Sequence, residues 1–215
     1  MPQNPATDTK EKQAKEREYR RQTDIYVRFV DVLFAVVVGQ SFGLLTSSPT
    51  YRACIMEPAK NAETIAGLIL IYLLVMSSWY YYHRSTRRFP IRSPIRFGID
   101  VALLFLYYLG FLAAPHLTEI MAILFDVFVG YLLWEFVRFL EYYREKNRQF
   151  FEWKIATTLG FTLISLVLPL LFDLMMRVIA GIQWLYFAIL IIFVLGYRWA
   201  KLKVPRYFAP DSSVL

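Results

Sequence analysis

Five long stretches of the chain contain no Asp, Glu, Lys or Arg and consist mainly of apolar and aromatic residues. They cover residues 32–51, 64–83, 101–118, 155–172 and 178–197. Each is close to the ~20 residues that a helix needs to cross the hydrocarbon core of a bilayer. A sixth stretch, residues 118–140, is apolar apart from Asp126, Glu135 and Arg138. We therefore predict an all-α integral membrane protein with six transmembrane helices.

The basic residues fall in alternate gaps between these stretches. Of the 24 Lys and Arg residues, 21 lie within residues 1–28, 84–96, 138–154 and 198–206. The positive-inside rule places these regions, and with them both termini, in the cytoplasm. The short outer connections at 114–118 and 173–177 predict two antiparallel hairpins, of helices three and four and of helices five and six. The predicted organisation is a charged cytoplasmic tail (1–24), a six-helix transmembrane domain (25–200) and a cytoplasmic C-terminal tail (201–215).

Composition supports a membrane protein. The chain is 57% hydrophobic and 18% aromatic, more apolar than a soluble domain of this length. The expected partner is the lipid bilayer, and no nucleic-acid partner is expected. Topology accounts for most of the charge in the basic segment 84–96, and recognition of anionic lipid head groups there is an alternative.

Residues for enzyme or cofactor chemistry are sparse. The two histidines, His83 and His116, are predicted at opposite faces of the membrane, so they cannot share a haem or a metal ion. Cys54 is the sole cysteine, in the longest outer connection, and a free thiol is expected. No HExxH or GxSxG motif occurs. For Asp31 and Asp100 the simplest role is capping a helix N-terminus. We expect no catalytic residue, metal site or cofactor, and no enzymatic activity.

The first helix carries a stripe of small and polar residues. Val32, Val36, Gly39, Gln40 and Gly43 recur at helical spacing along one face. Such a face suits water or another helix better than lipid. It is either a pore-lining face or a close helix contact in which Gln40 is hydrogen-bonded to a neighbour.

Charged residues also occur within the fourth predicted helix. Asp126 lies about 12 Å from its outer end, so it is either a cation or proton site or is satisfied by a Tyr or by Arg177. Glu135 and Arg138 are three residues apart and are expected to pair. Aromatic residues at the inner ends of the helices are expected to form an interfacial belt: residues 79–82, Trp134, Tyr142, Tyr143 and Trp199.

Two motifs resemble a known family. Residues 29–35 (FVDVLFA) resemble the Phe-Ser-Asp-x-x-Phe-Ala opening of the first helix in the transmembrane protein 175 family, which are potassium-permeable channels of endolysosomes and their prokaryotic relatives. Residues 79–84 (WYYYHR) are similar to the Trp and His cluster at the same end of that family's second helix. The length and the six predicted helices also match one repeat of the family.

The resemblance implies a homotetramer in a prokaryotic plasma membrane that conducts monovalent cations, chiefly potassium, through a pore lined by helix one. The family's constriction positions, which hold large aliphatic residues, fall on Val36, Gln40 and Gly43. These residues are smaller and more polar, so the expected pathway is wider or wetter, or absent.

The resemblance also assigns a structural role to Asp31. It would anchor the inner mouth of the pore through Trp79 and His83 and would not bind ions. Two other functions stay open: a proton-coupled secondary transporter built around Asp126, and a non-transporting accessory or scaffold subunit of a membrane complex.

Overall fold

The computed structural model describes residues 5–142, 148–178 and 183–208, and all regular secondary structure in these ranges is helical. The helices are α1 (Pro5–Ser47), α2 (Pro49–Met56), α3 (Ala62–Arg88), α4 (Pro94–Ala113), α5 (Leu117–Tyr142), α6 (Arg148–Val178) and α7 (Gln183–Phe208). All of them except α2 are long and apolar enough to cross a bilayer. The prediction of an all-α, multi-pass integral membrane protein is confirmed.

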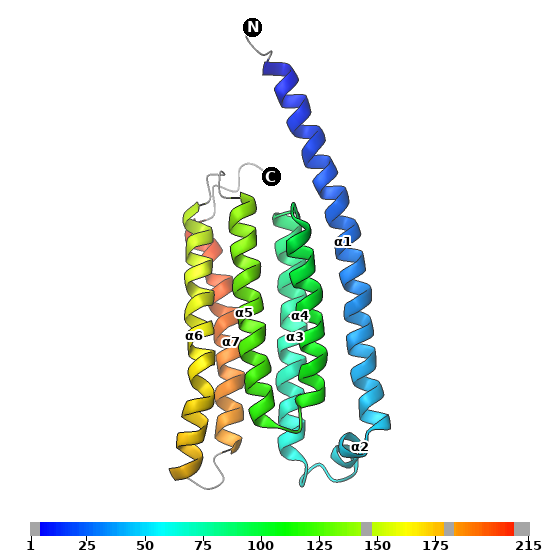
Figure 1. The fold of residues 1–215 in the computed structure, drawn as a ribbon, viewed down its shortest axis with the longest axis vertical. Coiled ribbons are helices and arrows are strands. Elements are labelled where there is room, and N and C mark those ends of the chain that lie inside the picture. Colours follow the sequence, from blue (N-terminus) through cyan, green and yellow to red (C-terminus); the bar gives the residue numbers. More distant parts are fainter. Residues whose placement is uncertain (1–4, 143–147, 179–182, 209–215) are drawn as a thin grey trace.

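The spanning helices stand side by side, and α1 occupies one edge of the bundle (Figure 1). It packs against α4 and α3, while its first turns project beyond the other helices (Figure 1). The most extensive packing is that of α5 against α6 and α4, and residues 114–116 join α4 to α5 in a tight hairpin. The chain enters α1 and leaves α7 at the same end of the bundle. This end, which holds residues 84–96, 138–142, 148–154 and 198–203, is called the basic end below.

Several helix boundaries differ from the sequence prediction. Because α1 is continuous from Pro5 to Ser47, the described part of the charged tail is helical, and it continues into the first span without a break. Asp31 therefore lies inside a helix, and the expected N-capping role is wrong. Capping by Asp100 is wrong as well, because α4 is capped by Ser93, whose Oγ accepts a hydrogen bond from the Ile95 backbone N–H at 3.2 Å.

The connection between α1 and α3 contains the short helix α2, which the hydropathy pattern did not predict. Its Tyr51 is buried, and the phenol donates to the backbone carbonyl of Phe111 at the end of α4. Burial raises the pKa of Tyr51 to about 12, so the phenol remains a donor at neutral pH. Cys54 is also buried, with its Sγ 3.4 Å from the Thr50 carbonyl oxygen. The thiol is free and turned inward.

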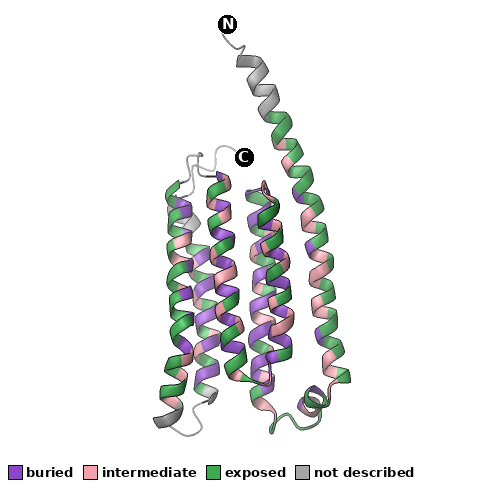
Figure 2. Ribbon diagram, in the orientation of Figure 1, coloured by how far each residue is buried: buried purple, intermediate pink, exposed green. Residues whose placement is uncertain are grey.

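Burial is uneven across the bundle (Figure 2). The apolar core lies between α3, α4, α5 and α7, whereas most of α1 is exposed or half-buried. The predicted aromatic belt divides in two: Trp79, Tyr80 and Trp199 face outward, but Trp134 and Tyr142 are buried. The last two are therefore part of the protein interior, and Tyr143 lies outside the described residues.

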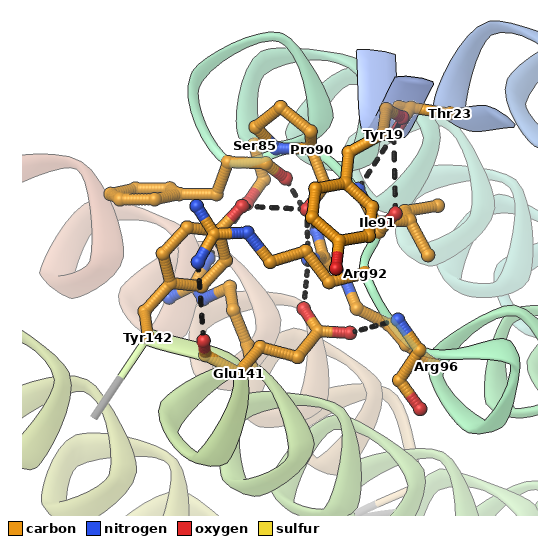
Figure 3. A network of polar contacts seen from close by, with 12 residues as sticks. Tyr19, Thr23, Ser85, Pro90, Ile91, Arg92, Arg96, Glu141 and Tyr142 are labelled. Carbon is orange, nitrogen blue, oxygen red and sulfur yellow. Dashed lines mark hydrogen bonds and ion pairs between the residues drawn. The ribbon is translucent and has the colours of Figure 1, made fainter. Parts of the chain in front are cut away.

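The connection between α3 and α4 is fixed by polar contacts from two other helices (Figure 3). From α5, the Glu141 carboxylate accepts from Arg96 Nη1 at 2.9 Å and from the Ser93 backbone N–H at 2.8 Å. From α1, Thr23 Oγ1 accepts from the Ile91 backbone N–H at 2.7 Å. Arg96 is fully buried and the Glu141 side chain is 4% exposed. These contacts hold the lower-numbered part of α1 against the basic end.

Glu141→Gln is expected to lower the free energy of unfolding by about 3 kcal/mol, because it leaves the Arg96 guanidinium buried without its counter-charge. The measurement is thermal unfolding of the purified protein in detergent. Glu152→Gln is the matched control: its ion pair with Arg148 is exposed, so a loss of no more than ~1 kcal/mol is expected. Equal effects of the two substitutions would contradict this assignment.

Candidate functional site

Asp31 is the meeting point of α1 and α3 near the basic end. Its Oδ1 accepts a hydrogen bond from Trp79 Nε1 at 3.1 Å and lies 2.8 Å from His83 Nε2. The ring of Phe34 stacks on Trp79 at a centroid distance of 5.7 Å, which extends the contact by one turn of α1. The structure thus brings together the three residues that the family resemblance grouped, and the Asp31 carboxylate joins two helices.

The small and polar stripe of α1 faces away from the rest of the chain. Val32, Val36, Gly39, Gln40 and Gly43 are all exposed. A Cβ atom added to Gly39 or to Gly43 would meet no other atom within 4 Å. No hydrogen bond joins the Gln40 amide to any residue that the structure describes. A close contact between this stripe and another helix of the same chain, one of the two expectations, is therefore not found there.

The opposite face of α1 makes the contacts within the chain. Leu33, Phe34, Val37 and Leu44 pack against the apolar core. Ser41 is buried, and its hydroxyl is 2.7 Å from the Tyr72 hydroxyl of α3. Helix α1 therefore has one face packed against the bundle and one uncovered face, on which the Gln40 amide lies among small and apolar residues.

A cavity of about 590 Å³, counting its open mouth, lies between α1, α3, α4, α5 and α7. Val30 and Phe34 of α1 form part of its wall. The buried Tyr82 Oη on its lining has no hydrogen-bond partner among the described residues. Buried polar groups are rarely left unsatisfied, so we expect water in this cavity. The pattern of charge-free stretches did not reveal it, because it is formed by five helices distant in sequence.

A cluster of buried charges lies beside the cavity, centred on Glu135. Its carboxylate pairs with Arg138 on the same helix, as predicted, and with Lys201 of α7 at 2.6 Å. Tyr81 of α3 donates to the same carboxylate at 3.4 Å and accepts from Lys154 of α6 at 2.6 Å. The cluster therefore connects four helices inside the bundle.

Sequence reasoning missed the part that Lys154, Arg198 and Lys201 play inside the protein. In the sequence prediction these three residues lie in cytoplasmic loops, where the positive-inside rule accounts for their charge. Arg198 Nε donates to Ser77 Oγ at 2.9 Å and its Nη2 donates to Tyr131 Oη at 2.7 Å. The available signal was the spacing of Arg198 and Lys201, which puts two cations on one face of α7.

Asp126 and His116 lie apart from these groups. Asp126 is exposed on α5, does not line the cavity between α1, α3, α4, α5 and α7, and has no ion pair or hydrogen bond to a described residue. The side chain of Arg177, its expected alternative partner, is outside the described residues. His116 lies in the hairpin between α4 and α5, at the far end of the bundle from His83.

We expect the contact between Asp31 and His83 to be energetically coupled. A double-mutant cycle of Asp31→Ala and His83→Ala, read by thermal unfolding, should give a coupling of about 1 kcal/mol, typical of one hydrogen bond on a half-exposed group. The control cycle pairs Asp31→Ala with His116→Ala, whose effects should add to within ~0.5 kcal/mol. A coupling no larger than that of the control would mean that Asp31 does not hold α1 to α3.

Comparisons of the chain with protein-family models, with curated proteins and with solved structures found no match.

Proposed function

We propose that this chain is a subunit of a homo-oligomeric cation channel in which the uncovered face of α1 lines the pathway. The observation that supports this proposal is the exposed side chain of Gln40. It lies near the middle of a stretch without charges, so on a lone chain its amide would face hydrocarbon. Leaving an amide there without a hydrogen-bond partner costs several kcal/mol. A water-filled pathway or a neighbouring subunit removes that cost.

The small residues beside Gln40 support close association of several copies. Gly39 and Gly43 have open space around them, and small residues let the backbones of neighbouring membrane helices approach each other. A single α1 helix cannot enclose a pathway, whereas copies related by a closed symmetry axis can. The resemblance to the transmembrane protein 175 family favours four copies.

The chemistry of the stripe favours a cation. No Lys or Arg occurs from residue 32 to residue 51, and amide oxygens are suitable ligands for potassium as it leaves bulk water. Val36, Gln40 and Gly43 leave a wider and wetter constriction than a ring of large aliphatic side chains. Asp31 contributes by holding α1 in place, since its Oδ1 is already engaged by Trp79 and His83.

The proposal includes an orientation of the bundle in the membrane. The basic end faces the cytoplasm, in agreement with the positive-inside rule, in a prokaryotic plasma membrane. The carrier alternative has less support, because Asp126 does not line the cavity between the helices. If the chain were an accessory subunit, a partner protein would have to cover the exposed amide of Gln40.

Potassium flux through liposomes that contain the purified protein tests the pathway. Val36→Trp and Gln40→Leu are expected to lower the flux at least tenfold, because a bulky or apolar side chain narrows and dries the constriction. The matched control is Leu163→Trp on α6, another exposed apolar position, and it should leave the flux unchanged. Flux no greater than that of empty vesicles, from a sample shown to be folded, would overturn the proposal.

The detergent-corrected mass of the purified particle tests the assembly. A mass of four chains is expected, and Gly39→Trp should reduce it because the indole prevents close approach of neighbouring α1 helices. A single chain in mild detergent, with or without the substitution, would favour the accessory-subunit alternative. Uptake that depends on a pH gradient and is lost in Asp126→Asn would favour the carrier.

A further inference from the structure

A second cavity lies at the basic end, between α3, α6 and α7. It encloses about 350 Å³, counting its open mouth. Its walls carry four cationic side chains and no acidic one: Arg84, Arg88, Lys154 and Lys201. None of these residues belongs to the α1 stripe, so the cavity is separate from the proposed pathway.

Two of the four cations are buried and two are exposed. Lys154 and Lys201 are 5% and 1% exposed, while Arg84 and Arg88 are exposed at the surface. Arg88 lies over the rings of Phe89 and Phe150, each centroid 5.5 Å from its guanidinium carbon. The cavity therefore has ammonium groups in its interior and guanidinium groups at its surface.

Lys154 lacks an acidic partner among the residues that the structure describes. Its Nζ donates to Tyr81 Oη at 2.6 Å and lies 4.5 Å from the centroid of the Phe150 ring. The nearest carboxylate of the cluster, Glu135, is already occupied by Arg138 and Lys201. A buried ammonium whose direct contacts are a hydroxyl and aromatic rings, and whose nearby carboxylate is shared with two other cations, is incompletely compensated.

Buried positive charges outnumber buried negative charges across the whole basic end. Among the described residues, five cationic side chains are buried there, Arg96, Arg138, Lys154, Arg198 and Lys201, against three acidic ones, Asp100, Glu135 and Glu141. Uncompensated buried charge is especially costly in a membrane protein, where it requires a partner or water. An anion bound in the cationic cavity would supply the missing negative charge.

We propose that this cavity binds a phosphate group, either the head group of an anionic phospholipid or a free phosphate compound from the aqueous phase. Guanidinium groups match phosphate oxygens with paired hydrogen bonds, and an ammonium group adds a point charge. Basic pockets between transmembrane helices at the cytoplasmic side are suited to phosphate head groups. Phe89, Phe150 and Leu202 supply an apolar wall for the adjoining part of a lipid.

Two binding assays on the whole protein distinguish the sources. In lipid-free detergent, the probe is inorganic phosphate against chloride at equal ionic strength, read as a rise in the midpoint of thermal unfolding. In nanodiscs of phosphatidylcholine with or without phosphatidylglycerol, the readout is the phosphatidylglycerol that remains bound after extraction, measured by native mass spectrometry. A response to phosphate assigns a soluble ligand, and retention of phosphatidylglycerol assigns a head group. Either result supports the site.

The variants test whether the response comes from this cavity. Arg84→Gln combined with Arg88→Gln changes only exposed side chains, and it should weaken binding roughly 25-fold, at about fivefold for each cation beside the phosphate. Lys154→Met should abolish binding. Arg87→Gln is the matched control: Arg87 is exposed on the same turn of α3 but does not line the cavity, and it should bind like the unchanged protein. No preference for phosphate or phosphatidylglycerol, or an equal response in the double variant and the control, would overturn the proposal.

Discussion

The bundle depends on one buried carboxylate, that of Glu135. It lies on α5, pairs with Arg138 on the same helix and with Lys201 on α7, and accepts from Tyr81 on α3. Tyr81 in turn accepts from Lys154 on α6. In a membrane the hydrophobic effect does not favour contact between helices over contact with lipid, so packing and polar contacts have to hold them together. A charge network that reaches four helices does this at the basic end and also fixes which faces of these helices meet.

Helix α1 lies outside this network. It is attached at Thr23, Asp31 and Ser41, each through one or two hydrogen bonds. The ion pair of Glu16 with Arg92 at 3.6 Å and the apolar residues on one face add to these contacts. The remaining face has no partner in the chain. An edge helix that packs on the bundle with one face and leaves the Gln40 amide uncovered on the other is an arrangement suited to assembly around α1. The proposed channel gives that uncovered face a role, and the phosphate site gives one to the charge excess elsewhere.

Much of this architecture could be predicted from the distribution of charge along the chain. Five of the six spans followed from stretches without charged residues, because burying a charge in lipid is costly. The sixth, residues 118–140, followed from its apolar character despite three charges. The pair Glu135 and Arg138 followed from helical spacing. The contact of Asp31 with Trp79 and His83 was anticipated only through the resemblance to a family. Trp79 is 48 positions and His83 is 52 positions from Asp31 in the sequence, so local spacing could not predict the contact.

The same reliance on the distribution of charge caused the main omissions from the sequence prediction. Lys154 and Lys201 were treated as loop residues, which hid the fact that they turn inward. A helix extends beyond its apolar stretch, and its charged end turns can still pack against a neighbour. The assumption that a helix begins where charge ends also produced the incorrect capping role of Asp31. Which side chains line a cavity depends on how five helices meet, and that information is absent from the pattern of any one of them.

The unbroken course of α1 has a mechanical consequence. Its 43 residues form a rod of about 65 Å at 1.5 Å per residue, of which the charged first turns project from the bundle. No flexible joint separates those turns from Gln40, so a twist or tilt applied to the projecting part is transmitted along the rod to the uncovered face. Thr23 and Asp31 lie between the two, in the position of a fulcrum. A change in the tilt of the projecting turns is therefore also a change in the tilt of the helix that carries Gln40.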